Sequence, residues 1–369
     1  MLVSFSKYLF TGFLVAIIFL AGFYLGHFLD LGKDAALLSP FGTIELEPKR
    51  PYQQYTIANL AKRRYTPSNI TVEKVLEETD KITSFLFTYQ STNRKITGQL
   101  NIPKPLLAPT ADQTTPTPVI IMLRGYVPVE TYQTGIGTKN VAAILAENGY
   151  VTLAPDFLGF GESDPEPVDV WEARFIKPIN VIELINSIKA NPTLRPSLLS
   201  DHTVLLDAQN LGIWAHSNGG QVALTLLEIL GEPIPTTLWA PVTSPFPYSV
   251  LFYSDENEDE GREARAWVAL FEQDYDAREF SLTQYLNRLT GFIQIHHGAV
   301  DEAAPQTWSD EFVDKVETEN KRRAVSKDIE LSATDLTYFT YPRADHNLQP
   351  DWNTVVQRDL SFFDTHLRN

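Results

Sequence analysis

The residues best suited to catalysis lie in the second half of the chain. Ser217 stands in residues 211–230 (LGIWAHSNGGQVALTLLEIL), where an apolar strand, a tight turn and a helix follow one another. Such a turn raises a serine hydroxyl above the edge of a sheet, where it can attack a carbonyl carbon. Gly219 keeps the turn small, and Ala215 stands where glycine is usual. The context predicts a nucleophilic serine at position 217.

A serine nucleophile needs a base, and the base needs a carboxylate that orients it. His346 and Asp301 each follow a short apolar segment with the pattern of a strand. Serine, aspartate and histidine in this chain order, each on a loop after a strand, match the order in which this turn motif receives its partners. We therefore predict a catalytic triad of Ser217, Asp301 and His346. Glu302 is the rival acid, but its side chain should point away in such a turn.

The remaining histidines are weaker candidates for the base. They lie in the N-terminal apolar run, in the last predicted helix or beside strands, where packing explains them: His27, His366, His202, His216, His296 and His297. A metal site is disfavoured because the chain has no cysteine and the adjacent histidine pair lacks the i, i+4 spacing of ligands on a helix. We expect neither a metal nor a cofactor.

Negative charge on the attacked carbonyl oxygen requires two hydrogen-bond donors, commonly backbone N–H groups. One should be the N–H of Asn218, which follows the serine. The other should come from the loop after the apolar segment 119–123, and we nominate the N–H of Tyr126. A glycine-bearing turn at 156–163 should shape the other side of the site.

Alternating strands and helices should position these residues. The strands are predicted at 84–90, 95–102, 119–123, 150–154, 211–215, 237–240, 292–296 and 336–341, and the helices at 139–148, 171–190, 218–230 and 351–368. The first two strands read as a hairpin, and Gly231 as a helix C-cap. This alternation predicts an α/β fold with a mostly parallel central sheet and helices on both faces.

A helical insertion is expected at about 243–290, where the alternation stops. It would cover the carboxyl ends of the strands, where open α/β sheets bind ligands, and could act as a lid. The insertion carries the acidic run SDENEDE at 254–260. The run is typical of a solvated loop; the functional alternative is that it binds a cationic group of the substrate, such as a peptide amino terminus.

The N-terminus has a different composition from the rest. Residues 8–28 contain no charged side chain, and a helix of about 21 residues spans roughly 30 Å of hydrocarbon. We predict an uncleaved membrane anchor at 1–30, with a cleaved signal peptide as the alternative. The short N-terminal tail favours an extracytoplasmic catalytic domain. Residues 31–80, which contain several prolines, should form an arm on the surface of the domain at 81–369.

The composition sets further limits. The 369 residues, 43% of them apolar, are enough to bury a full core. The absence of cysteine excludes disulfides and a cysteine nucleophile. A net charge of −16 should repel nucleic acid, so no nucleic-acid partner is expected.

A known family shows a similar series of motifs. The pieces GQLNIPKP, RGY, APDFLGFGESD, GIWAHSNGG, IQIHHGAVDEAAP and YPRADHNL occur in the order of a prolyl-oligopeptidase-type (S9) catalytic domain. Over about residues 80–369 the chain resembles the S9-like and dienelactone-hydrolase-like proteins that hold only this domain. The resemblance implies an α/β-hydrolase fold with the three triad roles above. It departs from the family at Arg124, where many relatives have histidine, and in leaving no chain for a β-propeller.

Three functions remain open. The resemblance favours a serine peptidase that cleaves short peptides through an acyl-enzyme. A carboxylic-ester hydrolase would use the same triad and pass through the same tetrahedral intermediate. A non-catalytic anchored scaffold is the third possibility, against which a complete triad argues.

Overall fold

The computed structural model describes residues 38–39, 42–43, 50–108, 114–195, 203–255, 258–326 and 333–368. The chain divides into two compact units, Met1–Arg50 and Pro51–Asn369. In the first unit, β1 (Leu38–Ser39) pairs antiparallel with β2 (Gly42–Thr43). The predicted anchor at 1–30 lies outside the described residues. Among the helices in the described ranges, none is long and apolar enough to cross a membrane.

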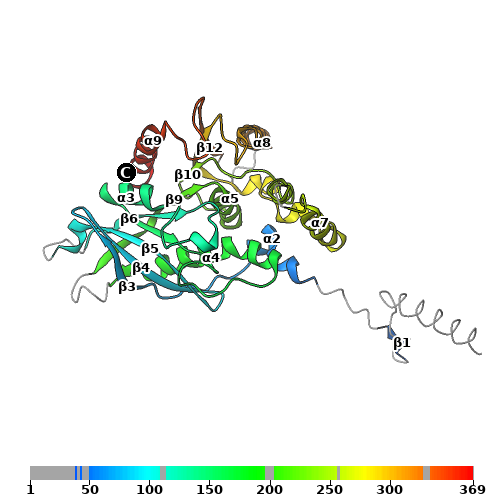
Figure 1. Ribbon diagram of the computed structural model, residues 1–369, viewed down its shortest axis with the longest axis horizontal. Helices are drawn as coiled ribbons and strands as arrows, with labels where there is room; N and C mark the ends of the chain where they lie inside the picture. The colour runs from blue at the N-terminus through cyan, green and yellow to red at the C-terminus, as the bar shows by residue number, and fades with distance from the viewer. Residues whose placement is uncertain are drawn as a thin grey trace, which may run out of the picture. The chain divides into compact units, whose positions relative to one another are not determined.

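The second unit is built on a ten-stranded sheet (Figure 1). Its order is β12-β11-β10-β9-β6-β7-β5-β4-β3, and β8 (Thr193–Leu194) pairs with β9. The strands are β3 (Thr71–Glu78), β4 (Ile82–Ser91), β5 (Arg94–Pro103), β6 (Thr117–Leu123), β7 (Val151–Pro155), β9 (Val204–His216), β10 (Thr236–Trp239), β11 (Gly291–Gly298) and β12 (Thr334–Tyr341). Neighbours from β12 to β7 run parallel, and β5, β4 and β3 continue antiparallel.

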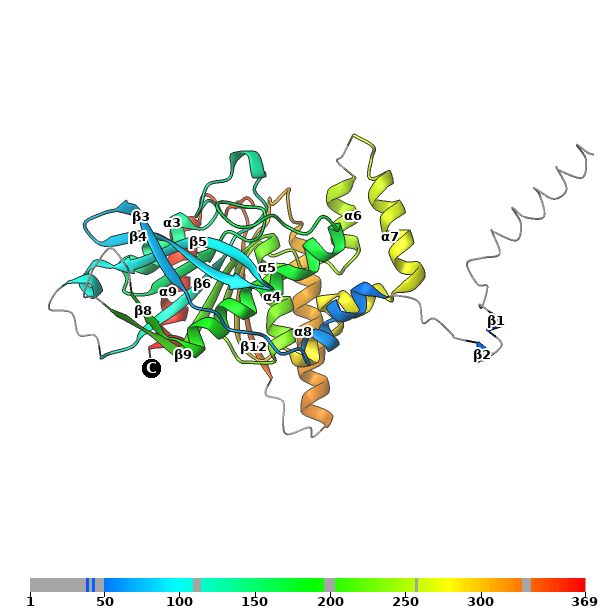
Figure 2. The ribbon, with the colours of Figure 1, turned by 90° about the horizontal axis from the view of Figure 1, so that it is seen from below.

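Helices cover both faces of this sheet, which explains its continuous apolar strands. Every residue of β7 is buried, as is Val119–Leu123 within β6. α3 (Lys139–Glu147) and α9 (Trp352–Leu367) share one hydrophobic cluster. α4 (Val170–Ala190), α5 (Asn218–Leu230) and α8 (Gln306–Ser326) share the other (Figures 1 and 2). The sheet therefore sits between two helical layers, as the sequence predicts.

The predicted strands and helices are all present to within a few residues, except that β9 begins seven residues early. Two of the longer elements have no counterpart in the sequence-based prediction. β3 lies at the sheet edge and buries one of its eight residues, so its pattern is polar. α8 is a largely exposed, charged helix whose buried positions include Phe312 and Val316. Hydrophobic patterning signals such peripheral elements weakly.

The segment predicted as a surface arm at 31–80 is divided at residue 50. Residues 51–80 belong to the same compact unit as the rest of the domain. They begin with the 3₁₀ helix η2 (Pro51–Tyr55) and the short helix α2 (Ile57–Leu60), whose Ile57 and Leu60 are buried in the core. They end in β3, which pairs with β4. This part therefore contributes to the domain core and its sheet.

Helices of both kinds occupy much of residues 243–290. This segment contains α6 (Tyr248–Ser254), α7 (Arg262–Asp274) and the 3₁₀ helices η5 (Ala277–Phe280), η6 (Leu282–Gln284) and η7 (Leu286–Arg288). Two further 3₁₀ helices lie elsewhere, η3 (Lys104–Leu107) and η4 (Val129–Thr131). Aromatic rings join the insertion to α4: Phe271 lies 5.1 Å from Trp171, and Phe280 lies 4.8 Å from Phe175, between ring centroids.

The acidic run at 254–260 contributes carboxylates to its own local structure. Asp255 pairs with Arg265 at 2.6 Å. Asp259 accepts the N–H groups of Gly261 at 3.0 Å and Glu263 at 2.7 Å, at the start of α7. These two carboxylates therefore stabilise the turn between α6 and α7.

Candidate active site

The strand order brings the predicted site residues to one edge of the sheet. The chain passes from β6 to β7 on one side and then returns to β9 on the other side of β6. Leu123 at the end of β6 pairs in register with Ala215 of β9. The loops that follow these two strands therefore meet at the switch point, where open α/β sheets bind ligands. They carry Tyr126 and Ser217.

The backbone at Ser217 adopts a strained turn between β9 and α5. Its φ of 55° and ψ of −123° are costly for a residue with a Cβ, by about 1–3 kcal/mol. The Ser217 N–H donates to Trp239 O at 2.9 Å, and its carbonyl accepts from Val242 N at 3.0 Å. A Cβ at Gly219 would lie 2.2 Å from Leu123 O. Only glycine therefore fits beside the turn at that position.

Asp301 and His346 come from neighbouring loops that are held together by their backbones. Ala299 N donates to Tyr341 O at 2.9 Å, and Val300 N donates to Ala344 O at 3.1 Å. A Cβ at Gly298 would stand 2.1 Å from Ala344 O, so the approach requires glycine. The result is a hydrogen bond of 2.8 Å between His346 Nδ1 and Asp301 Oδ2.

The surroundings of Asp301 favour its charged form. Oδ1 accepts the N–H groups of Ala303 and Ala304, both at 2.9 Å, and Oδ2 also lies 3.2 Å from His297 Nε2. Burial alone would raise the pKa of Asp301. Hydrogen bonds from His297, His346 and Ala304 outweigh burial and hold this pKa well below its usual range. The carboxylate therefore fixes the proton of neutral His346 on Nδ1 and leaves Nε2 as the acceptor.

His297 was interpreted from the sequence as packing, and the structure gives it a more specific place. It is fully buried, with Nε2 2.9 Å from Ala304 O and Nδ1 2.8 Å from Ser309 Oγ. Because a carbonyl only accepts, Nε2 carries the proton and points it toward Asp301 as well. Its position directly after an apolar strand was the signal available in the sequence. Glu302, the rival acid, is exposed.

His216 supports the loop of His346, in line with the packing role expected from the sequence. Its Nε2 donates to the His346 carbonyl at 2.9 Å, and the two imidazole centroids lie 4.7 Å apart. Burial, and then the neighbouring His346, lower the pKa of His216 to about 4. The ring is therefore uncharged at neutral pH, and it links the turn before Ser217 to the histidine loop.

The Ser217 hydroxyl is largely buried, with 8% of the residue exposed. A Cβ on Gly125 would lie 2.8 Å from Ser217 Cβ, so the loop after β6 runs directly against the serine. Across the described ranges, Ser217 Oγ forms no hydrogen bond, including none to His346. Catalytic hydrogen bonds often tighten only when substrate binds. His346 is thus hydrogen-bonded to Asp301, and its backbone carbonyl is hydrogen-bonded to His216, the residue before Ser217.

The two predicted oxyanion donors are backbone N–H groups that have no partner among the described residues. The Asn218 N–H opens α5 and receives no side-chain cap, and neither it nor the Tyr126 N–H bonds to another described residue. Arg124 Nη1 donates to Gly125 O at 2.9 Å. Since a trans peptide points its C=O and N–H in opposite directions, this bond turns the Tyr126 N–H away from Arg124. The Tyr126 side chain itself is 79% exposed.

Arg124 is a buried cation at this loop. Its guanidinium carbon lies 4.1 Å from the Phe160 ring centroid and 4.5 Å from that of Tyr132, and Nη2 donates to Asp156 O at 3.0 Å. Burial lowers the pKa of Arg124 from its ordinary value. The predicted glycine-bearing turn at 156–163 supplies Asp156 and Phe160 to this arrangement. Arg124 therefore fixes the loop against the turn.

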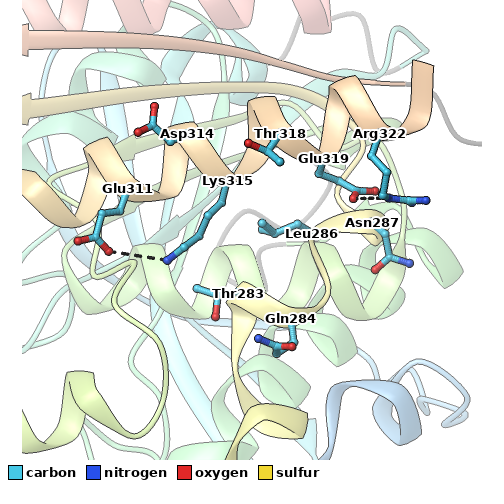
Figure 3. A pocket seen from close by; sticks show the side chains of 10 residues that line it. All are labelled: Thr283, Gln284, Leu286, Asn287, Glu311, Asp314, Lys315, Thr318, Glu319 and Arg322. Atoms are coloured by element: carbon cyan, nitrogen blue, oxygen red, sulfur yellow. Dashed lines mark hydrogen bonds and ion pairs between the residues drawn. The ribbon is translucent and has the colours of Figure 1, made fainter. Parts of the chain in front are cut away.

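A large cavity elsewhere on the domain lacks an arrangement of catalytic residues like that at Ser217, Asp301 and His346. A cavity of about 740 Å³ lies between α8 and residues 283–287 (Figure 3). Four of its five charged residues pair with one another, Lys315 with Glu311 at 3.7 Å and Arg322 with Glu319 at 2.7 Å. None of the predicted site residues lines it, so the chemistry is better placed at Ser217.

Comparison with solved structures identifies the fold as that of the α/β-hydrolases. Acetyl xylan esterase from Paenibacillus sp. R4 matches with a TM-score of 0.59 and 16% identity over 86% of this chain and 96% of that one. Acetyl xylan esterase 1 from Thermoanaerobacterium sp. JW/SL YS485 matches with a TM-score of 0.55 and 14% identity, over 85% and 94%. At these identities the likeness establishes the fold alone.

Peptidase structures also match. A putative dipeptidyl aminopeptidase IV from Bacteroides ovatus has a TM-score of 0.55 and 14% identity over 79% of this chain. This chain spans 37% of that protein's length. No family model matches the sequence, and no curated protein matches it either.

His216 predicts a pH-dependent stability. Its folded-state pKa of about 4 is below the ordinary 6.5, so the unfolded chain takes up the proton first as the pH falls. The stabilisation is present above pH 6.5 and is lost between 6.5 and 4, by at most about 1.4 kcal/mol per pH unit. Replacing the imidazole by an amide, His216→Gln, should remove this part of the slope. Urea unfolding at pH 7, 6 and 5 measures it, and identical slopes in both proteins would contradict the assignment.

Proposed function

We propose that this chain is a serine hydrolase that cleaves acyl compounds through a covalent acyl-enzyme. His346 Nε2 takes the proton from Ser217 Oγ as the oxygen attacks the acyl carbon, while Asp301 stays ionised and stabilises the imidazolium. The N–H groups of Asn218 and Tyr126 bind the oxyanion. His346 then gives its proton to the leaving group. Water, deprotonated by His346, releases the acid and regenerates Ser217.

One observation carries the proposal. The strained turn at Ser217 is bonded through the preceding His216 to the loop of His346, which in turn bonds to Asp301, and the first N–H of the following helix has no partner among the described residues. A serine held at unfavourable φ and ψ, beside a histidine whose tautomer a carboxylate fixes, is the arrangement that activates a hydroxyl for acyl transfer. A non-catalytic scaffold would have no need for the strain at Ser217.

Carboxylic esters are the substrate class that we favour. The acetyl xylan esterases match this chain over nearly their full length, whereas the dipeptidyl aminopeptidase matches over about a third of its own. In the insertion, Asp255 and Asp259 are engaged in their own turn, which weakens the hypothesis that the acidic run binds a peptide amino terminus. Both points support carboxylic esters as the substrate class.

Short peptides are the second candidate. The S9-like motif series and the similarity to peptidase structures favour them. Comparing 4-nitrophenyl butyrate with aminoacyl and dipeptidyl 4-nitroanilides on the full-length chain separates the two classes. Hydrolysis of esters alone supports the first candidate, and efficient release of nitroaniline supports the second.

The serine assignment predicts a specific loss. Ser217→Ala should reduce kcat for the cleaved substrate about 10³-fold or more, because the proposed triad then lacks the hydroxyl that forms the acyl-enzyme. The melting temperature should change little, since Ala keeps the same Cβ in the turn. Ser361→Ala, in the exposed part of α9, is the control and should retain full activity. Activity retained in Ser217→Ala would refute the mechanism.

The choice of acid predicts a contrast between neighbours. Asp301→Asn should lower kcat by about 10²- to 10⁴-fold, because an amide no longer fixes the proton on His346 Nδ1. Glu302→Gln, an isosteric change at the exposed neighbour, should leave kcat within about twofold of the original value. Steady-state kinetics on one ester measures both variants. A larger loss for Glu302→Gln would make it the acid.

We also propose that residues 1–30 anchor the chain in a membrane with the catalytic domain on the extracytoplasmic side. The support is the uncharged run at 8–28, whose length matches a bilayer. The full-length chain should remain in the membrane pellet after a carbonate wash, and a chain that begins at residue 31 should be released. Full-length protein in the supernatant would contradict the anchor.

A further inference from the structure

A narrow cavity opens beside the proposed nucleophile, between α4 and α5. Asn218 lines it, and so do Arg174 and Lys177 from α4. Leu60, Phe246 and Phe280 close it from the N-terminal segment and the insertion. Its volume is about 60 Å³, room for roughly four water molecules or one small polar group. None of its lining residues is acidic.

Arg174 reaches this cavity as a cation with neutral partners. Its Nη2 donates to Gln221 Oε1 at 2.8 Å and to Ser249 Oγ at 3.2 Å, and its guanidinium lies 5.8 Å from the Phe246 ring centroid. Burial lowers the pKa of Arg174 to about 10, which still leaves it charged at neutral pH. Its positive charge is balanced by no carboxylate within the ion-pair distance in the described part of the chain.

Lys177 follows one helical turn later and makes fewer polar contacts than Arg174. It is partly buried, and it makes no hydrogen bond or ion pair with any residue of the described ranges. Burial, together with the neighbouring Arg174 and Arg124 and against the opposite effect of Glu166, lowers the pKa of Lys177 to about 8. Two positive charges, Arg174 and Lys177, therefore line one cavity together with Asn218, the residue after Ser217, in a chain whose net charge is −16.

Burying a charge without a partner is unfavourable, so an arrangement of this kind calls for a ligand that completes it. A carboxylate fits best: it is small enough for the cavity, and both a guanidinium and an ammonium donate to it. We propose that Arg174 and Lys177 bind a carboxylate carried by the substrate, next to the acyl bond that Ser217 attacks. The inference rests on the proposed function and narrows it to esters of anionic acyl compounds, such as half-esters of dicarboxylic acids.

Two esters that differ only in charge test this proposal on the full-length chain. Mono-(4-nitrophenyl) adipate carries a free carboxylate, and methyl 4-nitrophenyl adipate is its neutral counterpart. The wild-type chain should favour the charged ester at least tenfold in kcat/KM. Lys177→Met should lower kcat/KM for the charged ester about tenfold and leave the neutral ester within twofold. Lys177→Arg should restore most of the preference.

Lys189→Met is the matched control, since Lys189 lies on the same helix but pairs with Glu232 at 2.6 Å. It should change neither ester. Equal wild-type rates on the two esters, or an equal loss on both in Lys177→Met, would overturn the carboxylate site while the serine mechanism stands.

A binding measurement keeps the two proposals separate. If the wild-type chain hydrolyses neither ester, the proposed ester hydrolase fails, and calorimetry with adipate then tests the subsite directly. Adipate should bind the wild type at least fivefold more tightly than Lys177→Met, with Lys189→Met unchanged. Equal affinities, or no binding to the wild type, would overturn the subsite.

Discussion

The backbone turn at Ser217 constrains the rest of the site. A residue held at φ 55° and ψ −123° persists only if its surroundings leave it no alternative. Here β9 ends one residue before it and α5 begins one residue after it, and hydrogen bonds to Trp239 and Val242 hold both sides of its backbone. The close approach of Gly125 and Gly219 follows from the same turn, because the loop after β6 must fit beside it. The start of α5 directly after the turn also leaves the Asn218 N–H without a partner in the part of the chain that the structure describes.

Asp301 and His346 are positioned in a different way, by backbone hydrogen bonds between their loops. Two parallel strands end side by side, and backbone hydrogen bonds continue their pairing into the loops that carry Asp301 and His346. Asp301 then receives donors on both oxygens, which keep it ionised in spite of its burial. Orientation is therefore established before any substrate binds, and preorganised electrostatics of this kind lowers reaction barriers. His216 contributes as a neutral link between the histidine loop and the serine turn.

The charged residues near the nucleophile are opposite in sign to the net charge of the protein. The protein as a whole is strongly acidic, yet Arg124, Arg174 and Lys177 bring positive charge to the neighbourhood of the nucleophile. Arg124 donates from both terminal nitrogens to carbonyl groups, stacks on aromatic rings and belongs to the architecture of the oxyanion loop. Arg174 and Lys177 line the narrow cavity between α4 and α5 instead. A local field of this sign in a low-dielectric cleft would attract anions that the outer surface repels.

The sequence by itself determined the order of strands and helices, the α/β class and the location of Ser217, Asp301 and His346 on loops after strands. Those features are encoded locally, in apolar runs, in glycines and in the nucleophile turn. The peripheral elements β3 and α8 were not predicted, because they bury too few residues to leave a hydrophobic pattern in the sequence. The site at Arg174 and Lys177 was not predicted either. Both residues stand in an apolar helix, but the local sequence does not indicate what their side chains face. Only the tertiary structure decided that His297 faces Asp301, that His216 supports His346 and that Arg174 and Lys177 share a cavity with Asn218. Each of these depends on segments distant in the chain packing together, and side-chain contacts across such distances are set by the fold rather than by local spacing.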